Sequence, residues 1–371
     1  PVQKFLTRIG QLPNSANQAY SLVAFTSGIA SLCAWSFGLV IGAIVARSVA
    51  SECAKKSFKI HYPLLVASAY SGFVIWHMGF SSSAALFVAT PGHLLEDRVG
   101  IIPVTETILS STNIVLALMA LAIITIICPL MRPKDKDIIE FTPNTIDNID
   151  NSASDNQSEL TLIEKFENHR ALNIFLGFAL VSYIVVTYTQ NGFSLNLNIV
   201  SWTFLAFGLI LAASPMHFIK LINNAAATVG PIILQYPFYS GIMGMMATTG
   251  LMKVITDWII SISTPETLGF FAFLSGGLVN MFIPSGGGQW AVQGPIMIEA
   301  ALSLNVNPSV VVLGVAYGDQ WSNMIQPFWT IPILAIAGLH MRQILGYTFV
   351  IFIMTGFLYG GGMLYMGSGN I

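Results

Sequence analysis

Long apolar runs are the feature of this sequence that most limits how the chain can fold. A run of about 20 apolar residues is long enough to cross the hydrocarbon core of a bilayer as a helix. Of the residues, 54% are apolar and only 9% charged, and the mean hydropathy is +0.71. A water-soluble domain needs roughly 25% charged residues. The sequence therefore predicts an all-α polytopic membrane protein. The expected spans are 63–89, 108–131, 170–189, 199–215, 228–248, 308–336 and 343–366.

Two further apolar stretches, 20–46 and 268–298, are interrupted at their centres by AWSFG (34–38) and PSGGG (284–288). Each could be one long span or a re-entrant hairpin of two half-helices that enter and leave on the same face. The re-entrant course is favoured because it gathers most lysines and arginines on one side, as cytoplasmic faces do. That side then holds Lys4, Arg8, Arg47, Lys55, Lys56, Lys59, Arg132, Lys134, Lys136, Lys165, Arg170, Lys220 and Arg342, and the other Arg98 and Lys253.

An internal repeat relates the two halves of the chain. At an offset of 247 residues Tyr70 falls on Tyr317, and each half runs from an interrupted hairpin through a polar turn and a broken span to another span. The first hairpin would open to the cytoplasm and the second to the outside. This inverted arrangement lets a transporter expose one central site alternately to each side. We therefore expect a first membrane repeat at 1–131, a cytoplasmic hydrophilic linker at 132–169 and a second membrane repeat at 170–371.

The hydrophilic linker is rich in Asp, Asn and Ser and has no apolar period, so we expect it to be flexible. The repeat also places residue 1 opposite residue 248, and three expected spans of the second half precede that point. The chain begins with Pro rather than Met. We therefore expect the natural protein to carry further N-terminal spans, rather than a signal peptide.

The segment PSGGGQWAVQGP (284–295) breaks the backbone inside apolar sequence. Unpaired N–H and C=O groups at membrane depth cost several kcal/mol each unless they line a cavity or bind a ligand. Gly286, Gly287 and Gly288 would let the chain turn without side chains that block a ligand. The following half-helix would direct free N–H groups and the positive end of its dipole at the site, which suits an anion. A glycine-rich packing contact is the alternative.

No lysine or arginine occurs in the interrupted stretches or in the spans 63–89 and 308–336. A carboxylate substrate would then be held by backbone N–H groups, hydroxyls and amides. Each buried methylene is worth about 0.8 kcal/mol, so a four-carbon acid gains only ~2 kcal/mol from its tail. The candidate substrate-binding residues are Ser36, Gly38, Ser285, Gly286, Gly287, Gly288, Gln289, Trp290, Gln293 and Trp321, with Ser81, Ser82, Ser83, Trp35, Trp76, Phe328 and Trp329 as further hydroxyl or tail contacts.

Asp319 is the only acidic or basic residue of its span, and intramembrane ionisable residues commonly mark functional sites. A carboxylate substrate beside it would add a second negative charge, so a cation must accompany the substrate. Either Asp319 takes up a proton, or it binds Na⁺ with carbonyls of the broken segment YGDQWSN and neutral ligands from Tyr317, Gln320 and Asn323. Both give symport, and no other cofactor is expected. A structural aspartate that caps a helix break is the alternative. His77 is the counterpart in the first half, where a packing role is more typical.

Several segments resemble the short-chain fatty acid transporter family. They are FIPSGGGQWAVQGPIMIEAA, VAYGDQWSNMIQPFWTIPILAIAGL, WSFGLVIGAIVARSVA, YPLLVASAYSGF and GFSSSAALFVATPGH. The resemblance covers nearly the whole chain outside the hydrophilic linker. It implies a secondary transporter for acetoacetate, butyrate and similar acids in the cytoplasmic (inner) membrane, with an inverted-repeat fold that is often dimeric. A homodimer is therefore expected.

Other functions fit less well. A membrane enzyme would need a nucleophile–base pair or a metal cluster, and the sequence has no GxSxG, HExxH or CxxC. A net charge of −2 argues against nucleic acid, and Cys33, Cys53 and Cys128 show no paired spacing. A channel is a weaker fit because broken inverted hairpins favour carriers. The nearest rival is a carrier of the same fold for dicarboxylates or gluconate-like acids.

Overall fold

The computed structural model describes residues 8–56, 58–141 and 169–369, and the expectation for most of the hydrophilic linker lies outside this part of the chain. Within it the regular secondary structure is helical, with no strand, which confirms the all-α class. The chain forms two compact units, Pro1–Thr142 with Ile242–Ile371, and Pro143–Gly241. The first unit brings residues of both expected repeats together. The assignment of residues to two membrane repeats stays a prediction.

The first half of the larger unit contains two broken helical stretches. Helix α2 ends at Ala34, whose extended backbone (φ −158°, ψ 140°) separates it from α3. The second stretch tightens from an α-helix into a 3₁₀ helix and then breaks at Gly79–Ser82. The elements are α2 (Ala16–Cys33), α3 (Trp35–Lys55), α4 (Tyr62–Ser71), η1 (Gly72–Met78), α5 (Ser83–Val88), α6 (Glu96–Val99), η2 (Val104–Glu106), α7 (Ser111–Leu130) and η3 (Asp135–Asp137).

The C-terminal part of the larger unit follows the same order. A broken pair of helices, interrupted between Asn280 and Gly286, precedes a span that breaks after Ser322 and resumes at Thr330. A long unbroken helix follows. The elements are α12 (Leu251–Ile262), α13 (Leu268–Asn280), α14 (Gly286–Ser303), α15 (Pro308–Ser322), α16 (Thr330–Ala337) and α17 (Met341–Gly367).

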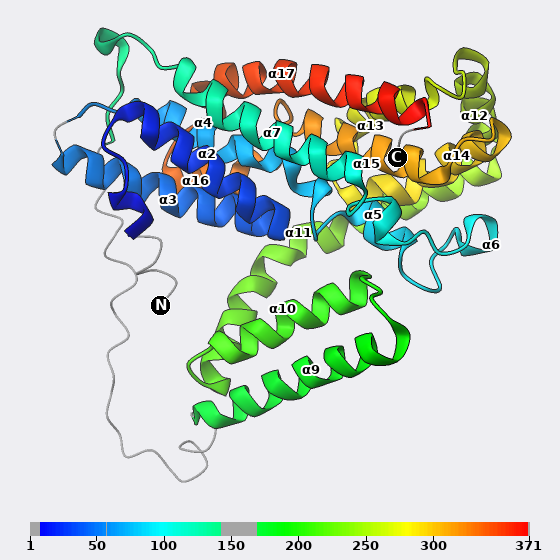
Figure 1. The fold of residues 1–371 in the computed structure, drawn as a ribbon, viewed down its shortest axis with the longest axis horizontal. Coiled ribbons are helices and arrows are strands. Elements are labelled where there is room, and N and C mark those ends of the chain that lie inside the picture. The colour runs from blue at the N-terminus through cyan, green and yellow to red at the C-terminus, as the bar shows by residue number, and fades with distance from the viewer. Residues whose placement is uncertain (1–7, 57, 142–168, 370–371) are drawn as a thin grey trace. The chain divides into compact units, whose positions relative to one another are not determined.

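The smaller unit consists of α9 (Arg170–Asn191), α10 (Leu197–Leu211) and most of α11 (Pro215–Thr248). Helices α9 and α10 pack side by side (Figure 1). Asn196 caps α10 by accepting a 3.1 Å hydrogen bond from Ile199 N. Such a cap satisfies one of the free N–H groups at a helix start.

The two expected hairpins appear as broken helix pairs whose breaks lie where the sequence placed them. The first pair covers 16–55 rather than 20–46, and the second covers 268–303 rather than 268–298. Ser36 and Gly38 fall in the first turn of α3, and Ser285 is the N-cap of α14. The re-entrant course of these pairs through a bilayer stays a prediction.

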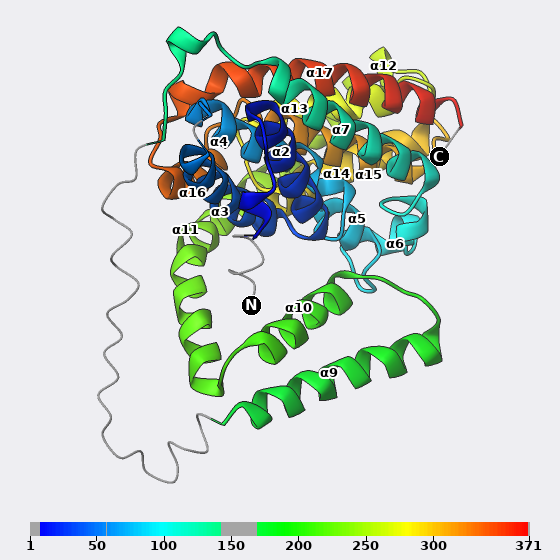
Figure 2. The same cartoon turned by 60° about the vertical axis from the view of Figure 1, so that its left-hand side comes forward.

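The last part of each broken span packs against helices of the other half. Helix α16 packs on α3 and α4, and α5 packs on α14 and α15. In Figures 1 and 2 the first group lies at one end of the larger unit and the second group at the other. Each half thus places the last part of its broken span against the second hairpin helix of the other half. This reciprocal packing is what a pair of inverted repeats predicts.

Five described helices are long and apolar enough to cross a membrane: Trp35–Lys55, Tyr62–Val88, Ser111–Leu130, Arg170–Gln190 and Met341–Gly367. The most apolar window of Tyr62–Val88 is 89% buried by protein, whereas that of Met341–Gly367 is 33% buried. The broken span is therefore central, where irregular backbone is shielded from lipid. Helix α17 lies beside α7 (Figure 1) and exposes apolar side chains such as Phe357.

Helices α13 and α15 approach each other through glycine. A Cβ atom built on Gly318 would collide with the carbonyl oxygen of Phe273, and one on Gly276 would lie 2.9 Å from the carbonyl oxygen of Val315. Such spacing leaves no room for a side chain. The two backbones are therefore in direct contact beside Asp319, which follows Gly318 in the chain.

Candidate functional site

The N-terminus of α14 forms one wall of the candidate site. Ser285 caps this helix, since its Oγ accepts a 3.3 Å hydrogen bond from Gly288 N and its carbonyl accepts one from Gln289 N. A Cβ atom on Gly286 would lie 2.8 Å from His77 Nε2 and 2.8 Å from Trp76 Cη2. One on Gly287 would meet nothing within 4 Å. The first turn of α14 therefore touches η1 on one side and opens onto free space on the other.

The facing wall is the 3₁₀ segment η1, which carries His77. A 3₁₀ turn places successive side chains differently from an α-helix and often marks a functional irregularity. The backbone N–H of His77 donates a 2.8 Å hydrogen bond to Gln320 Oε1, and its Nδ1 lies 3.3 Å from Ser82 Oγ. The side chain is 1% exposed. His77 is thus fixed on both sides by residues of the two halves.

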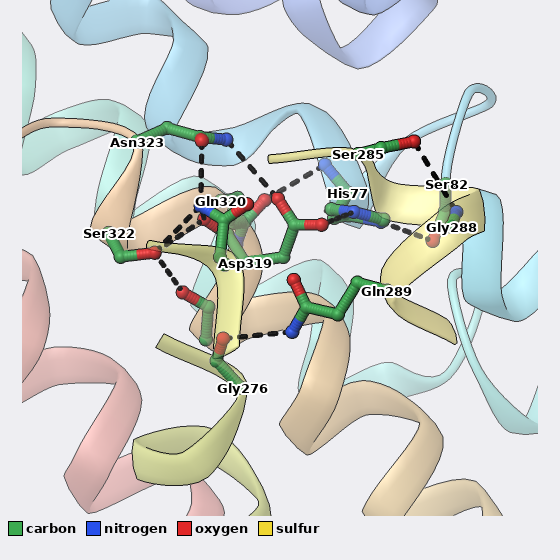
Figure 3. A network of polar contacts seen from close by, with 12 residues as sticks. His77, Ser82, Gly276, Ser285, Gly288, Gln289, Asp319, Gln320, Ser322 and Asn323 are labelled. Carbon is green, nitrogen blue, oxygen red and sulfur yellow. Dashed lines mark hydrogen bonds and ion pairs between the residues drawn. The ribbon is translucent and has the colours of Figure 1, made fainter. Parts of the chain in front are cut away.

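Asp319 on α15 faces His77 across this interface (Figure 3). Its Oδ2 lies 3.3 Å from His77 Nε2, and its side chain is 2% exposed. The other carboxylate oxygen, Oδ1, accepts a 3.3 Å hydrogen bond from Asn323 Nδ2. The contact with His77 has ion-pair distance but not hydrogen-bond geometry, and neither atom has another hydrogen-bond partner among the described residues. The two halves therefore meet at a buried acid–base pair.

An amide network holds the break after α15. Asn280, the last residue of α13, donates from Nδ2 to Asn323 Oδ1 at 2.8 Å, to Ser322 Oγ at 2.8 Å and to the Asp319 carbonyl at 3.1 Å. The Asn280 Oδ1 atom has no hydrogen-bond partner within the described part of the chain. Sequence reasoning missed Asn280, since a lone asparagine at the end of an apolar run belongs to no pattern.

Two glutamines of α14 line its inner face. Gln289 Nε2 donates to the Gly276 carbonyl at 2.8 Å and to Gln293 Oε1 at 3.0 Å, and Gln293 Nε2 donates to Ser275 Oγ at 2.9 Å. These contacts join α14 to α13. The Gln289 Oε1 atom is buried without a hydrogen-bond partner in the described residues, and it points toward the Asp319 carboxylate in Figure 3.

The structure brings together Ser285, Gly288, Gln289, Asp319, Gln320 and Asn323 (Figure 3), and Gly286 lies beside His77. Gly287 lies in the same helical turn, and Gln293 joins through Gln289. Tyr317 is buried and donates a 2.7 Å hydrogen bond to Asn113 Oδ1. Gln320 Oε1 and Asn323 Oδ1 already accept N–H groups. Each of the three groups expected as neutral cation ligands thus already makes one hydrogen bond, and their role as ligands stays a prediction.

The tip of the first hairpin makes separate contacts. Trp35 N donates a 2.9 Å hydrogen bond to Ser81 Oγ, and the carbonyl of Gly38 accepts a 3.0 Å bond from Ser27. Ser36 is partly buried one residue beyond Trp35. The first contact joins the α2–α3 break to the loop after η1, and the second joins α2 to α3.

Tryptophans surround the site at different depths. The Nε1 atoms of Trp76, Trp290 and Trp329 are buried without a hydrogen-bond partner in the described structure. The Trp35 and Trp329 rings make an edge contact at 5.0 Å. Trp321 instead stacks on Phe352 of α17 at 4.1 Å and donates to the Phe352 carbonyl at 2.7 Å. Among the described residues no three His, Cys, Asp or Glu side chains gather as metal ligands.

The sequence matches the family model described as short chain fatty acid transporter over residues 1–366. The chain belongs to the short-chain fatty acid transporter family. Two relatives, from Escherichia coli strain K12 and Haemophilus influenzae strain Rd, are each named "Putative short-chain fatty acid transporter". Both are 36% identical to it, over 97% and 98% of this chain and 81% and 82% of their own lengths. The resemblance seen in the hairpin motifs is thereby confirmed.

The fold of this family member is also found in a solved transporter. The Alcanivorax borkumensis YdaH transporter superposes with a TM-score of 0.61, covering 97% of this chain and 80% of the other, at 12% sequence identity. The likeness at this identity concerns the fold. Family membership and the apolar helices make the chain a transporter rather than an enzyme, and a multi-pass protein of the cytoplasmic membrane.

Proposed function

We propose that this family member carries short-chain monocarboxylates such as acetoacetate and butyrate across the cytoplasmic membrane by cation-coupled symport. The observation that carries the proposal is the first turn of α14, which is open at Gly287 and lies against the buried His77–Asp319 pair. The names of the relatives support the substrate class.

The carboxylate would bind at the N–H groups of the first turn of α14. Ser285 already satisfies the N–H groups of Gly288 and Gln289. The N–H groups of Gly286 and Gly287 are thus the ones left for a ligand, and the helix dipole favours a negative charge there. Buried Trp76 Nε1 and His77 Nε2, which lack hydrogen-bond partners in the described residues, are further polar atoms at this position.

The tail of the acid would lie among aromatic rings. Trp76 lies directly beside the α14 tip, and Trp290 is 1% exposed in the same helix. Each buried methylene contributes about 0.8 kcal/mol, so neighbouring chain lengths should differ in affinity by only about fourfold.

Charge balance requires a cation with the substrate. Two carboxylates ~5 Å apart repel by roughly 3 kcal/mol at an effective dielectric of about 20. The buried side chains of the described residues include Asp319 but no lysine or arginine. A proton or Na⁺ at Asp319 would offset the second negative charge. Coupling the anion to a cation gradient then follows from the same requirement.

A dicarboxylate is a poorer substrate for this site. Its second carboxylate would add another negative charge, and the described core offers no buried lysine or arginine to meet it. Butyrate and succinate uptake into proteoliposomes of the full-length protein, with imposed H⁺ or Na⁺ gradients, tests the proposal. We expect gradient-driven accumulation of butyrate. Accumulation of succinate instead would contradict it. A homodimer stays a prediction from the family resemblance.

A further inference from the structure

We propose that the coupling cation is a proton, held between His77 Nε2 and Asp319 Oδ2 where the two halves of the chain meet. This inference rests on the proposed symport. It identifies the coupling ion and adds His77 to Asp319 as a residue that holds the ion. The atoms lie 3.3 Å apart, and both side chains are almost completely buried. One partner comes from η1 and the other from α15.

The contacts of His77 suit a doubly protonated ring. Its Nδ1 lies 3.3 Å from Ser82 Oγ, an atom that accepts or donates hydrogen bonds, and its Nε2 faces a carboxylate oxygen. A neutral imidazole has one N–H and one acceptor nitrogen, whereas an imidazolium has two N–H groups. In the protonated ring each N–H faces an oxygen. A small reorientation of the two side chains would turn the 3.3 Å contact into a hydrogen bond when the proton is bound.

The net charge of the His77–Asp319 pair links proton binding to substrate binding. With neutral His77 the pair carries one negative charge, and with protonated His77 it carries none. Gly286 at the α14 tip lies against His77 Nε2, so a carboxylate bound at this tip is close to the pair. Burying a second unpaired charge is costly, while a neutral pair removes the repulsion. Substrate and proton should therefore bind together and leave together.

Among the described residues no lysine or arginine is buried near the pair. Fully buried tyrosines on the neighbouring elements include Tyr70 on α4, Tyr317 on α15 and Tyr359 on α17, whose hydroxyls donate to the Asn323 carbonyl, Asn113 Oδ1 and the Val74 carbonyl. Phenols are neutral near pH 7. The charged residues on packed helices, Arg47, Glu52 and Lys55 on α3, Glu299 on α14 and Arg342 on α17, are partly or fully exposed.

Sodium is less suited to the same position. Of the oxygens expected as its ligands, Gln320 Oε1 accepts His77 N and Asn323 Oδ1 accepts Asn280 Nδ2. Two buried amide oxygens, Asn280 Oδ1 and Gln289 Oε1, lack partners in the described chain and are the groups a metal cation would use. Two neutral amide oxygens and one carboxylate oxygen would leave the other ligands of a sodium ion to backbone carbonyls and water. Sodium therefore enters the test as the competing outcome.

The test measures butyrate binding and uptake by the full-length protein at a series of pH values. If one proton binds with each substrate, butyrate affinity falls by up to tenfold per pH unit once the pH is high enough that the substrate-free pair has lost its proton. His77→Gln keeps a polar side chain but cannot titrate in this range. We expect it to lose both accumulation driven by a pH gradient and the tenfold slope, whereas a purely structural His77 would leave the slope of the residual binding unchanged. His61→Gln, a matched change at a buried histidine outside the site, should retain the tenfold slope.

Ser82→Ala provides an independent variant should His77→Gln fold poorly. It removes the oxygen facing Nδ1 and should move the start of the affinity loss to lower pH without removing either titrating group. An unchanged pH profile in both variants would overturn the proton proposal. So would wild-type accumulation that follows a Na⁺ gradient and ignores pH, although butyrate symport itself would then stand. Failure of the wild type to carry butyrate under any gradient would overturn the proposed function as well.

Discussion

The hydroxyl of Tyr70 donates a 2.7 Å hydrogen bond to the carbonyl oxygen of Asn323. Tyr70 belongs to the broken span of the first half, and Asn323 begins the break in the span of the second half. The corresponding tyrosine of the second half, Tyr317, donates a 2.7 Å bond to Asn113 of the first. The tyrosines related by the sequence offset thus each reach into the opposite half.

Tyr70→Phe should destabilise the protein. It removes the donor for a buried carbonyl at a helix end, which costs about 1–3 kcal/mol. Thermal unfolding in detergent should show a lower midpoint than the wild type. Tyr183→Phe, at a residue that is 50% exposed on α9, is the matched control and should change little. Equal midpoints for Tyr70→Phe and the control would show that the Asn323 carbonyl finds another donor.

Gly287→Val should block substrate entry while leaving the fold largely intact. The Cβ position is open, so the added side chain occupies the approach of the anion instead of a packed core. Butyrate uptake should fall at least tenfold at normal expression. Gly346→Val on α17, whose Cβ position is also open, is the control for the change in backbone preference. Normal uptake by Gly287→Val would exclude the first turn of α14 as the carboxylate site.

Sequence reasoning anticipated the elements of the site better than its contacts. Proline, serine and three glycines inside apolar sequence mark a helix break, and Ser285 is indeed the N-cap of α14. A lone carboxylate in a span singled out Asp319. The partners of Tyr317 and Trp321 depend on which helices pack together. Which helices pack together is a property of the tertiary structure, and the 3.6-residue period of the sequence does not predict it.

Asp319→Asn should abolish accumulation of butyrate against its gradient. An amide cannot exchange a proton or supply a negative charge for a cation, yet it preserves shape and the contact with Asn323. Exchange of labelled for unlabelled substrate should persist, because exchange needs no net cation movement. Uptake in proteoliposomes with and without a gradient separates the two activities. Concentrative uptake by this variant would assign Asp319 a structural role.

The exposed ion pair between Arg98 and Glu299 links helix α6 to helix α14. Its side chains are 58% and 48% exposed, so we expect a contribution to stability of at most about 1 kcal/mol. A double-mutant cycle with Arg98→Ala and Glu299→Ala, measured by thermal unfolding at low and high salt, should show coupling that salt weakens. Coupling that persists in high salt would indicate a water-excluded contact.

His61 gives the larger unit a stability that depends on pH. Burial lowers the pKa of His61 from its ordinary value, while its Nδ1 accepts a 3.0 Å hydrogen bond from Ile139 N. Below the ordinary histidine pKa the unfolded chain binds a proton that the folded chain resists. Stability should therefore fall as pH drops from that value toward the lowered one. His61→Gln should flatten this part of the curve, and an unchanged acid slope would assign it to other groups.

His77 and Asn280 show why part of the site was beyond sequence reasoning. A single histidine in an apolar stretch is more often a packing residue, and only the approach of α15 to η1 gives it an acid partner. Asn280 ends an apolar helix without any neighbouring motif. Both residues act across long sequence separations, so their roles arise from the packing of the two halves.

The glycine contact between α13 and α15 has a mechanical consequence. Two helices whose backbones touch at Gly318 and Gly276 cannot slide without collision, so they should move as a single rigid rod. The α14 tip meets η1 at the small Gly286, beside the free space at Gly287. A hinge that opens the site would then bend at residues 281–285. Helix α14 would move about this hinge, while Asp319 would stay in place on α15.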